Sequence, residues 1–121
     1  MGVIPWSPLW RGMLAGVLAG GSAKGTRRAS SMVQDELAER RPQIEAYEKF
    51  CAELGQPPAE VALAWLLANP VVTAPIIGPR IAEQLEGAMR ALDLRLGAVE
   101  MKRLDEIWPG PGGPAPEAFA W

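Results

Sequence analysis

The chain has 121 residues, of which 49% are hydrophobic and 21% charged, with a formal net charge of -2. This suits one globular domain, and the charge gives no reason to expect nucleic acid or an anionic membrane as a partner. One cysteine and no histidine exclude an internal disulfide, histidine-ligated metals and the usual catalytic triads. No apolar run reaches the roughly 18 residues of a membrane span, and residues 1–12 do not resemble a signal peptide. We therefore expect a cytoplasmic protein without a metal site.

Residues 2–6 form a short apolar run that ends at the sequence SPL. The absence of polar alternation predicts a strand buried on both faces, as in a parallel sheet. Pro5 argues against a long regular strand, because proline cannot donate a ladder hydrogen bond. Five glycines then predict an irregular loop from residue 10 to about residue 31.

A small basic cluster lies in that irregular loop, at Lys24, Arg27 and Arg28. The glycines and lysine nearby do not have the spacing of a phosphate-binding P-loop. The favoured interpretation of the cluster is a solvated loop, and the alternative is an anion-binding group.

Helical patterns occupy most of the middle of the chain. A helix is predicted for residues 32–54, kinked or restarted at Pro42. Tyr47 and Cys51 lie on its apolar stripe, which predicts core packing for both. A second helix, residues 59–68, is apolar on nearly every face, which is typical of a helix deep in a larger structure.

The stretch APIIGPRIAEQL, residues 74–85, predicts a strand, a tight turn and a helix start in immediate succession. The strand is expected to begin at about residue 71. Arg80 lies where the helix begins, and free N–H groups, the helix dipole and a guanidinium together suit a phosphate. An ordinary strand–helix connection with a solvated arginine explains the same pattern.

The next helix should bury one side, made of Ile81, Leu85, Ala88 and Leu92. A last helix is predicted for residues 98–107, with Val99 and Leu104 facing inward, and an extended Pro/Gly-rich tail for residues 109–121. The order strand, loop, helices, strand, helix, helix amounts to two βα units, which implies parallel strands with helical crossovers.

Three motifs in this order resemble the aldo-keto reductase family. IPWSPLWRGMLAG (residues 4–16) resembles its seventh strand and following loop, and QPPAEVALAWLLANP (residues 56–70) is similar to the helix before its eighth strand. APIIGPRIAEQL then resembles the eighth strand and its cofactor loop. The resemblance covers essentially the whole chain. It implies an α/β fold that is part of a (β/α)8 TIM barrel, about two helix-rich βα units in residues 1–121 with a C-terminal helix.

The resemblance further implies that NADPH, rather than NADH, is the cofactor. It assigns Ser7, Pro8, Leu9, Arg11 and Gly12 of the first loop (residues 7–12) to the pyrophosphate. In the second loop (residues 78–84) it assigns Gly78, Arg80 and Gln84 to the adenosine end, with Arg80 on the 2′-phosphate.

Two departures from the family pattern affect these expectations. Gly87 and Ala88 stand where the family often carries an acid–amide pair facing the adenine. The family's catalytic Asp, Tyr, Lys and His precede the seventh strand, and no matching region or histidine is present here. Tyr47 lies in the wrong place to replace the catalytic tyrosine, so no catalytic residue is assigned.

We therefore expect the cofactor-binding C-terminal portion of an NADPH-dependent carbonyl or alcohol oxidoreductase, a truncated form inactive by itself. Three alternatives stay open: a non-catalytic nucleotide-binding module, an interaction module that completes a barrel with an N-terminal fragment or by self-association, and a non-functional remnant. A barrel with only two strands should also expose apolar patches.

Overall fold

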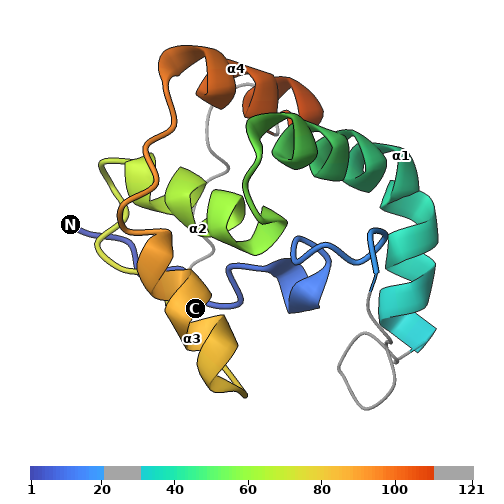
Figure 1. The fold of residues 1–121 in the computed structure, drawn as a ribbon, viewed down its shortest axis with the longest axis horizontal. Helices are drawn as coiled ribbons and strands as arrows, with labels where there is room; N and C mark the ends of the chain where they lie inside the picture. Colours follow the sequence, from blue (N-terminus) through green and yellow to red (C-terminus); the bar gives the residue numbers. More distant parts are fainter. Residues whose placement is uncertain (21–30, 111–121) are drawn as a thin grey trace, which may run out of the picture.

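The computed structural model describes residues 1–20 and 31–110. Its elements are a short 3-10 helix and four α-helices (Figure 1): η1 (Trp10–Gly12), α1 (Ser31–Leu54), α2 (Pro58–Ala68), α3 (Ala82–Arg90) and α4 (Ala98–Ile107). Each predicted helix is present within a residue or two of its expected bounds. The basic cluster and residues 111–121 of the tail lie outside the described residues.

Proline and glycine explain where two of these helices begin and end. Pro58 occupies the first turn of α2, where a missing N–H costs nothing. Gly55 follows α1 with a φ of 70°, the left-handed conformation that glycine adopts most readily. The amides of Gly55 and Gln56 then donate to the carbonyls of Ala52 and Cys51, which satisfies the last turn of α1.

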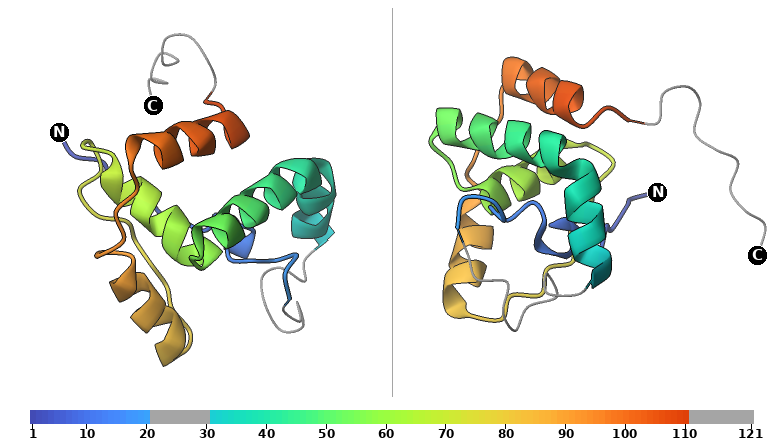
Figure 2. Two further views of the ribbon diagram at one scale, coloured as in Figure 1. Left: turned by 45° about the horizontal axis from the view of Figure 1, so that its top comes forward. Right: turned by 90° about the vertical axis from the view of Figure 1, so that its right-hand side faces the viewer.

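Helix α1 is continuous but bent, and Pro42 lies inside it. Figures 1 and 2 show its first part running beside the N-terminal segment and its second part turning across α2 and α4. Proline removes an internal hydrogen bond and crowds the preceding turn, which accounts for a bend at this position. One helix thereby reaches two different parts of the molecule.

Two clusters of buried side chains form the core. The larger cluster joins α1, α2 and α4 through Tyr47, Phe50, Cys51, Val61, Ala62 and Leu104. The smaller cluster joins the N-terminal segment to α1 through Met13, Val33 and Ile44. Core packing of Tyr47 and Cys51 is therefore confirmed, since they are 2% and 0% exposed.

The two segments predicted as strands lie side by side and run parallel, but they do not form a continuous ladder. Isolated bridges join Val3 to Val72 and Trp6 to Ile76. After the first bridge, a regular ladder would need amide donors from Pro5 and Pro75, which have none. The Pro5 carbonyl instead accepts from the Ile76 amide at 2.8 Å. The register therefore slips by one residue at the two prolines.

Several apolar side chains are more exposed than the sequence pattern predicted. Val3 and Trp6 are 48% and 76% exposed, so the prediction that the first strand is buried on both faces is wrong. Ile76 of the second segment is also exposed, at 57%. Val99 is exposed as well, and the predicted buried side of α3 is largely open, at Ile81, Leu85 and Leu92. The helix-rich order is confirmed, whereas the described residues supply no multi-stranded sheet that would cover these side chains.

Candidate functional site

The parallel direction of the two extended segments brings both candidate loops to the same end of the molecule. Val3 and Trp6 of the first segment pair with Val72 and Ile76 of the second. Parallel neighbours end side by side, so the first loop leaves at Ser7 next to where the second loop leaves after Ile77.

The first loop has an unusual backbone. Ser7, Trp10 and Arg11 have φ angles of 54°, 46° and 55°, and Gly12 has a φ of 92°. Residues with a Cβ seldom adopt this left-handed conformation because it brings the Cβ close to a carbonyl oxygen. Three such residues within five positions require support from the surrounding structure.

Part of that support comes from hydrogen bonds inside the first loop. The amide of Trp10 donates to the Ser7 carbonyl at 2.9 Å, and the amide of Gly12 donates to the Leu9 carbonyl at 2.8 Å. The amide of Arg11 donates to Ser7 Oγ at 3.4 Å. These bonds engage the backbone amides of Trp10, Arg11 and Gly12, so the Ser7 hydroxyl hydrogen and the Arg11 guanidinium are side-chain donors that remain for a ligand.

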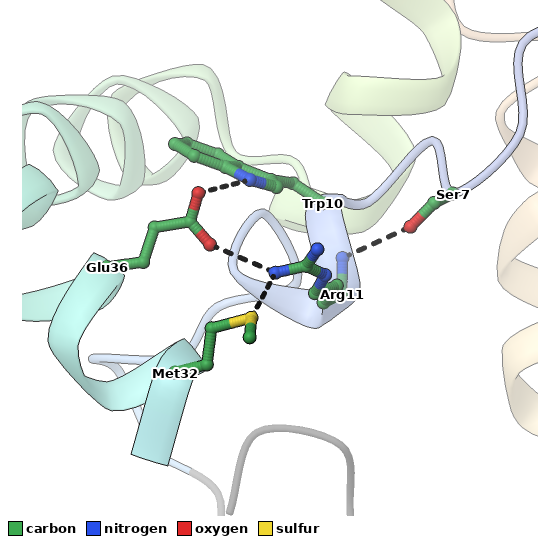
Figure 3. A network of polar contacts seen from close by, with 5 residues as sticks. All are labelled: Ser7, Trp10, Arg11, Met32 and Glu36. Atoms are coloured by element: carbon green, nitrogen blue, oxygen red, sulfur yellow. Dashed lines mark hydrogen bonds and ion pairs between the residues drawn. The ribbon is translucent and has the colours of Figure 1, made fainter. Parts of the chain in front are cut away.

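Glu36 of α1 supplies further support from 25 residues away (Figure 3). Its Oε1 accepts from Trp10 Nε1 at 3.1 Å, and its Oε2 accepts from Arg11 Nη1 at 3.4 Å. The same Nη1 lies 3.6 Å from Met32 Sδ. One carboxylate thus contacts two consecutive residues of the loop, both with left-handed backbones.

Aromatic packing fixes the other side of Trp10. Its ring meets Trp108 edge to face, with 5.6 Å between the ring centroids. The next part of the chain is held by Glu48 of α1, whose two carboxylate oxygens accept from the amides of Leu18 and Ala19 at 2.9 Å each. Both parts of α1 therefore hold the segment that contains the first loop.

An open depression of about 330 Å³ lies over the first loop. Its lining residues are Trp6, Ser7, Pro8, Trp10 and Arg11. Leu9 instead packs against the larger core cluster, so its side chain faces away from a ligand in the depression. Of the residues expected at the pyrophosphate, the structure therefore brings together Ser7, Pro8 and Arg11, with Gly12 beside them in η1.

The second loop is closed by a local contact at the start of α3. The amide of Arg80 donates to Gln84 Oε1 at 2.8 Å, and the amide of Gln84 donates to the Ile81 carbonyl at 3.2 Å. Gly78, Arg80 and Gln84 are all exposed and lie outside the depression over the first loop. The predicted helix start is confirmed, because α3 begins two residues after Arg80. The backbone bends at residues 80 and 81 rather than turning tightly at Gly78 and Pro79.

Gly87 has a packing role in this structure. A Cβ at this position would lie 3.3 Å from Glu60 Oε1 and 3.4 Å from Arg90 Nη2. Glu60 is 5% exposed on α2 and pairs with Arg90 of α3 at 2.7 Å. Glycine at position 87 lets α3 approach this ion pair, which is a physical reason for one of the two departures from the family pattern.

Tyr47 and Cys51 are buried on α1 in the larger core cluster. The hydroxyl of Tyr47 donates to the carbonyl of Pro58. Burial raises the pKa of Tyr47 above its ordinary value and raises that of Cys51 to about 11. Both groups therefore stay protonated at neutral pH, and Tyr47 has a structural role between α1 and α2.

Residues 1–20 and 31–110 contain neither a candidate membrane span nor a candidate metal site. No helix in this part of the chain is long and apolar enough to cross a membrane. The same residues contain no group of three or more His, Cys, Asp or Glu side chains that could hold a metal ion.

Comparison with known proteins identifies the family. Residues 1–109 match the model of the aldo/keto reductase family. The chain is 48% identical over 121 residues to an uncharacterized oxidoreductase, YrpG, of Bacillus subtilis, covering all of this chain and 36% of that protein. It is 32% identical over 117 residues to an aldo-keto reductase of Fusarium vanettenii, covering 89% of this chain and 30% of the relative.

One further relative is named as an ion-channel subunit rather than as an oxidoreductase. The chain is 30% identical over 115 residues to a putative voltage-gated potassium channel subunit beta of Schizosaccharomyces pombe, covering 88% of this chain and 33% of that protein. The chain thus spans about a third of the length of the curated relatives it matches. With a family match over residues 1–109, the chain belongs to the aldo/keto reductase family.

Proposed function

We propose that residues 1–121 are the NADPH-binding C-terminal portion of an aldo-keto reductase and correspond to strands seven and eight of a (β/α)8 barrel. The observation that carries the proposal is the parallel pairing of the two extended segments. It starts two arginine-containing loops at the same end of the molecule, where barrels of this class place their phosphate sites.

The donors in the two loops suit the phosphates of a dinucleotide. In the first loop, the Ser7 hydroxyl and the Arg11 guanidinium border the 330 Å³ depression and would hold the pyrophosphate. Pro8, Leu9 and Gly12 would shape the backbone beneath it. In the second loop, Arg80 at the start of α3 would bind the 2′-phosphate. The side-chain oxygen of Gln84 accepts a hydrogen bond from the backbone amide of Arg80. The side-chain nitrogen of Gln84 would then face the adenosine.

Bound NADPH supplies a hydride for carbonyl reduction, and this chain's residues would bind and orient the cofactor. The chain has no histidine, and its single tyrosine is buried against Pro58. We therefore propose that carbonyl reduction requires groups outside these 121 residues. The purified chain should then bind cofactor without turnover.

The test is a titration of the purified chain with NADPH, followed by nucleotide fluorescence. Arg80→Ala should weaken NADPH binding at least tenfold, since charge-assisted contacts contribute about 1.5–3 kcal/mol, and should leave NADH binding nearly unchanged. Arg40→Ala is the matched control, because Arg40 is exposed on α1 and bonds Gln43 of the same helix. The absence of a saturable change up to about millimolar NADPH would contradict the proposal, since a Kd above that corresponds to a binding free energy of under about 4 kcal/mol.

A second function is favoured by the exposed apolar side chains. Val3, Trp6 and Ile76 of the two paired segments are each at least 48% exposed, and exposed apolar side chains gathered in one region often mark an interaction surface. The chain would then be an interaction module that completes a barrel with an N-terminal fragment or by self-association. Size-exclusion chromatography with light scattering tests this alternative. A stable monomer that does not bind an added N-terminal barrel fragment would contradict it.

A further inference from the structure

Glu36 of α1 makes side-chain contacts to the first loop. It is not part of the loop, yet its two carboxylate oxygens accept hydrogen bonds from Trp10 and Arg11 (Figure 3). Val33 and Leu37 lie on the same face of α1 and pack in the smaller core cluster together with Trp10. This face of α1 is therefore held firmly against the loop.

The two residues that Glu36 contacts are those whose backbones most need a brace. Trp10 and Arg11 are consecutive, both carry a Cβ, and both have φ angles near 50°. Their amides are already satisfied within the loop or close to it. The side-chain contacts to Glu36 therefore add long-range support to a conformation that local sequence disfavours.

The geometry leaves most of the Arg11 guanidinium available to a ligand. Only Nη1 contacts Glu36, at 3.4 Å, while a guanidinium has five N–H donors. The Arg11 side chain is 44% exposed and borders the depression. Glu36 thus fixes one edge of the group and leaves the other edges toward the depression.

We infer that Glu36 is a positioning residue for dinucleotide binding. It holds Trp10 and Arg11 so that the first loop is already shaped for a pyrophosphate before the ligand arrives, which lowers the ordering cost of binding. This inference rests on the proposed NADPH-binding function. The competing possibility is that the carboxylate occupies Arg11 as a rival anion, in which case removing Glu36 would tighten binding.

The experiment compares wild type, Glu36→Ala, Glu36→Gln and Glu45→Ala in NADPH titrations. Glu36→Ala should raise the Kd for NADPH about five- to tenfold, equivalent to roughly 1–1.4 kcal/mol. Glu36→Gln should give partial rescue, since its oxygen still accepts from Trp10. Glu45→Ala should have no effect, because Glu45 is exposed on the same helix and pairs with Arg41. Wild-type affinity or tighter binding in Glu36→Ala would overturn the inference.

Hydrogen exchange without ligand separates this inference from the proposed function. In Glu36→Ala, the amides of residues 9–14 should exchange faster, with no matching change in α2 or α4. Unchanged exchange in the loop would overturn the inference, and so would a uniform increase throughout the chain, which indicates general destabilisation. If wild type fails to bind NADPH, the proposed function fails, and the exchange data still decide whether Glu36 holds the loop.

Discussion

The two candidate loops start at the same end of the molecule but are stabilised in different ways. The first loop contains four residues with positive φ and is braced by Glu36, which is about 25 positions away in the sequence. In the second loop, the amide of Arg80 is held by Gln84 at the start of the following helix. The first loop therefore depends on how α1 packs, whereas the second is shaped largely by its own sequence.

This difference predicts which substitutions affect structure at a distance from the substituted residue. A change in α1 that disturbs Glu36 or Glu48 should reach the first loop through hydrogen bonds to its side chains or to the backbone that follows it. A change in the second loop should affect ligand binding more than folding.

Trp10→Ala should destabilise the protein by about 2 kcal/mol, somewhat less than for a fully buried tryptophan. It removes the edge-to-face contact with Trp108 and the hydrogen bond to Glu36. Ile81→Ala in the second loop is the matched control and should cost less than about 0.5 kcal/mol, since Ile81 is 57% exposed. Urea unfolding followed by far-UV circular dichroism measures the free energy of unfolding of both variants. Equal losses of stability would contradict the predicted difference between the two loops.

Glu48→Gln should cost about 1.5 kcal/mol, because an amide side chain has one acceptor oxygen for two backbone donors. The amides of Leu18 and Ala19 each use one oxygen of the present carboxylate. Glu45→Gln, which alters an exposed ion pair on the same helix, should change the free energy of unfolding by under about 0.5 kcal/mol. The same urea titration measures both variants, and a neutral Glu48→Gln would mean that these bonds do not hold the segment.

Alanine substitutions at Gly12 and Gly78 compare the two loop backbones directly. Gly12 has a φ of 92°, so Gly12→Ala should cost about 1 kcal/mol. Gly78 has open space around its Cβ position and no left-handed φ, so Gly78→Ala should be neutral or stabilising by up to about 0.5 kcal/mol. The difference between their midpoints of thermal unfolding tests the prediction. A loss of stability in both variants would contradict it.

A further effect should come from alkaline pH, and it should leave the contrast between the loops intact. Burial raises the pKa of Cys51 from 9.0 to about 11. Above pH 9 the unfolded chain releases this proton while the native state keeps it, so stability falls as the pH rises toward 11. The raised pKa of Tyr47 acts in the same direction above pH 10. Urea unfolding at several pH values should show this decline, and Cys51→Ala should reduce it.

Much of the helical architecture follows from local sequence signals. Pro58 at the first turn of α2 and Gly55 after α1 act through their own backbone restrictions, so they can be recognised without knowledge of the fold. The start of α3 shortly after Pro79 follows in the same way. The parallel direction of the two extended segments followed from the helices between them.

Features that depend on tertiary contacts were missed or wrongly predicted. Glu36 and Glu60 resemble any other helical glutamate in the sequence, and their roles arise only when Arg11 and Arg90 are brought to them. The left-handed backbones of Ser7, Trp10 and Arg11 carry no glycine signal. Val99 has the helical spacing of a core residue, yet the described residues place nothing over it, and it is 69% exposed.

The prolines at positions 5 and 75 act as a spacing element between the two loops. Neither proline can donate to the ladder, and the Pro5 carbonyl accepts from Ile76 instead. The second segment therefore uses one extra residue, and Ile76 lies level with Trp6 rather than one residue, or roughly 3.3 Å, beyond it. Because strand side chains alternate, the same step also reverses which face Ile76 and its successors present. The relative height of Ser7 and Gly78 is therefore set by two imino acids that contribute no side-chain chemistry to either loop.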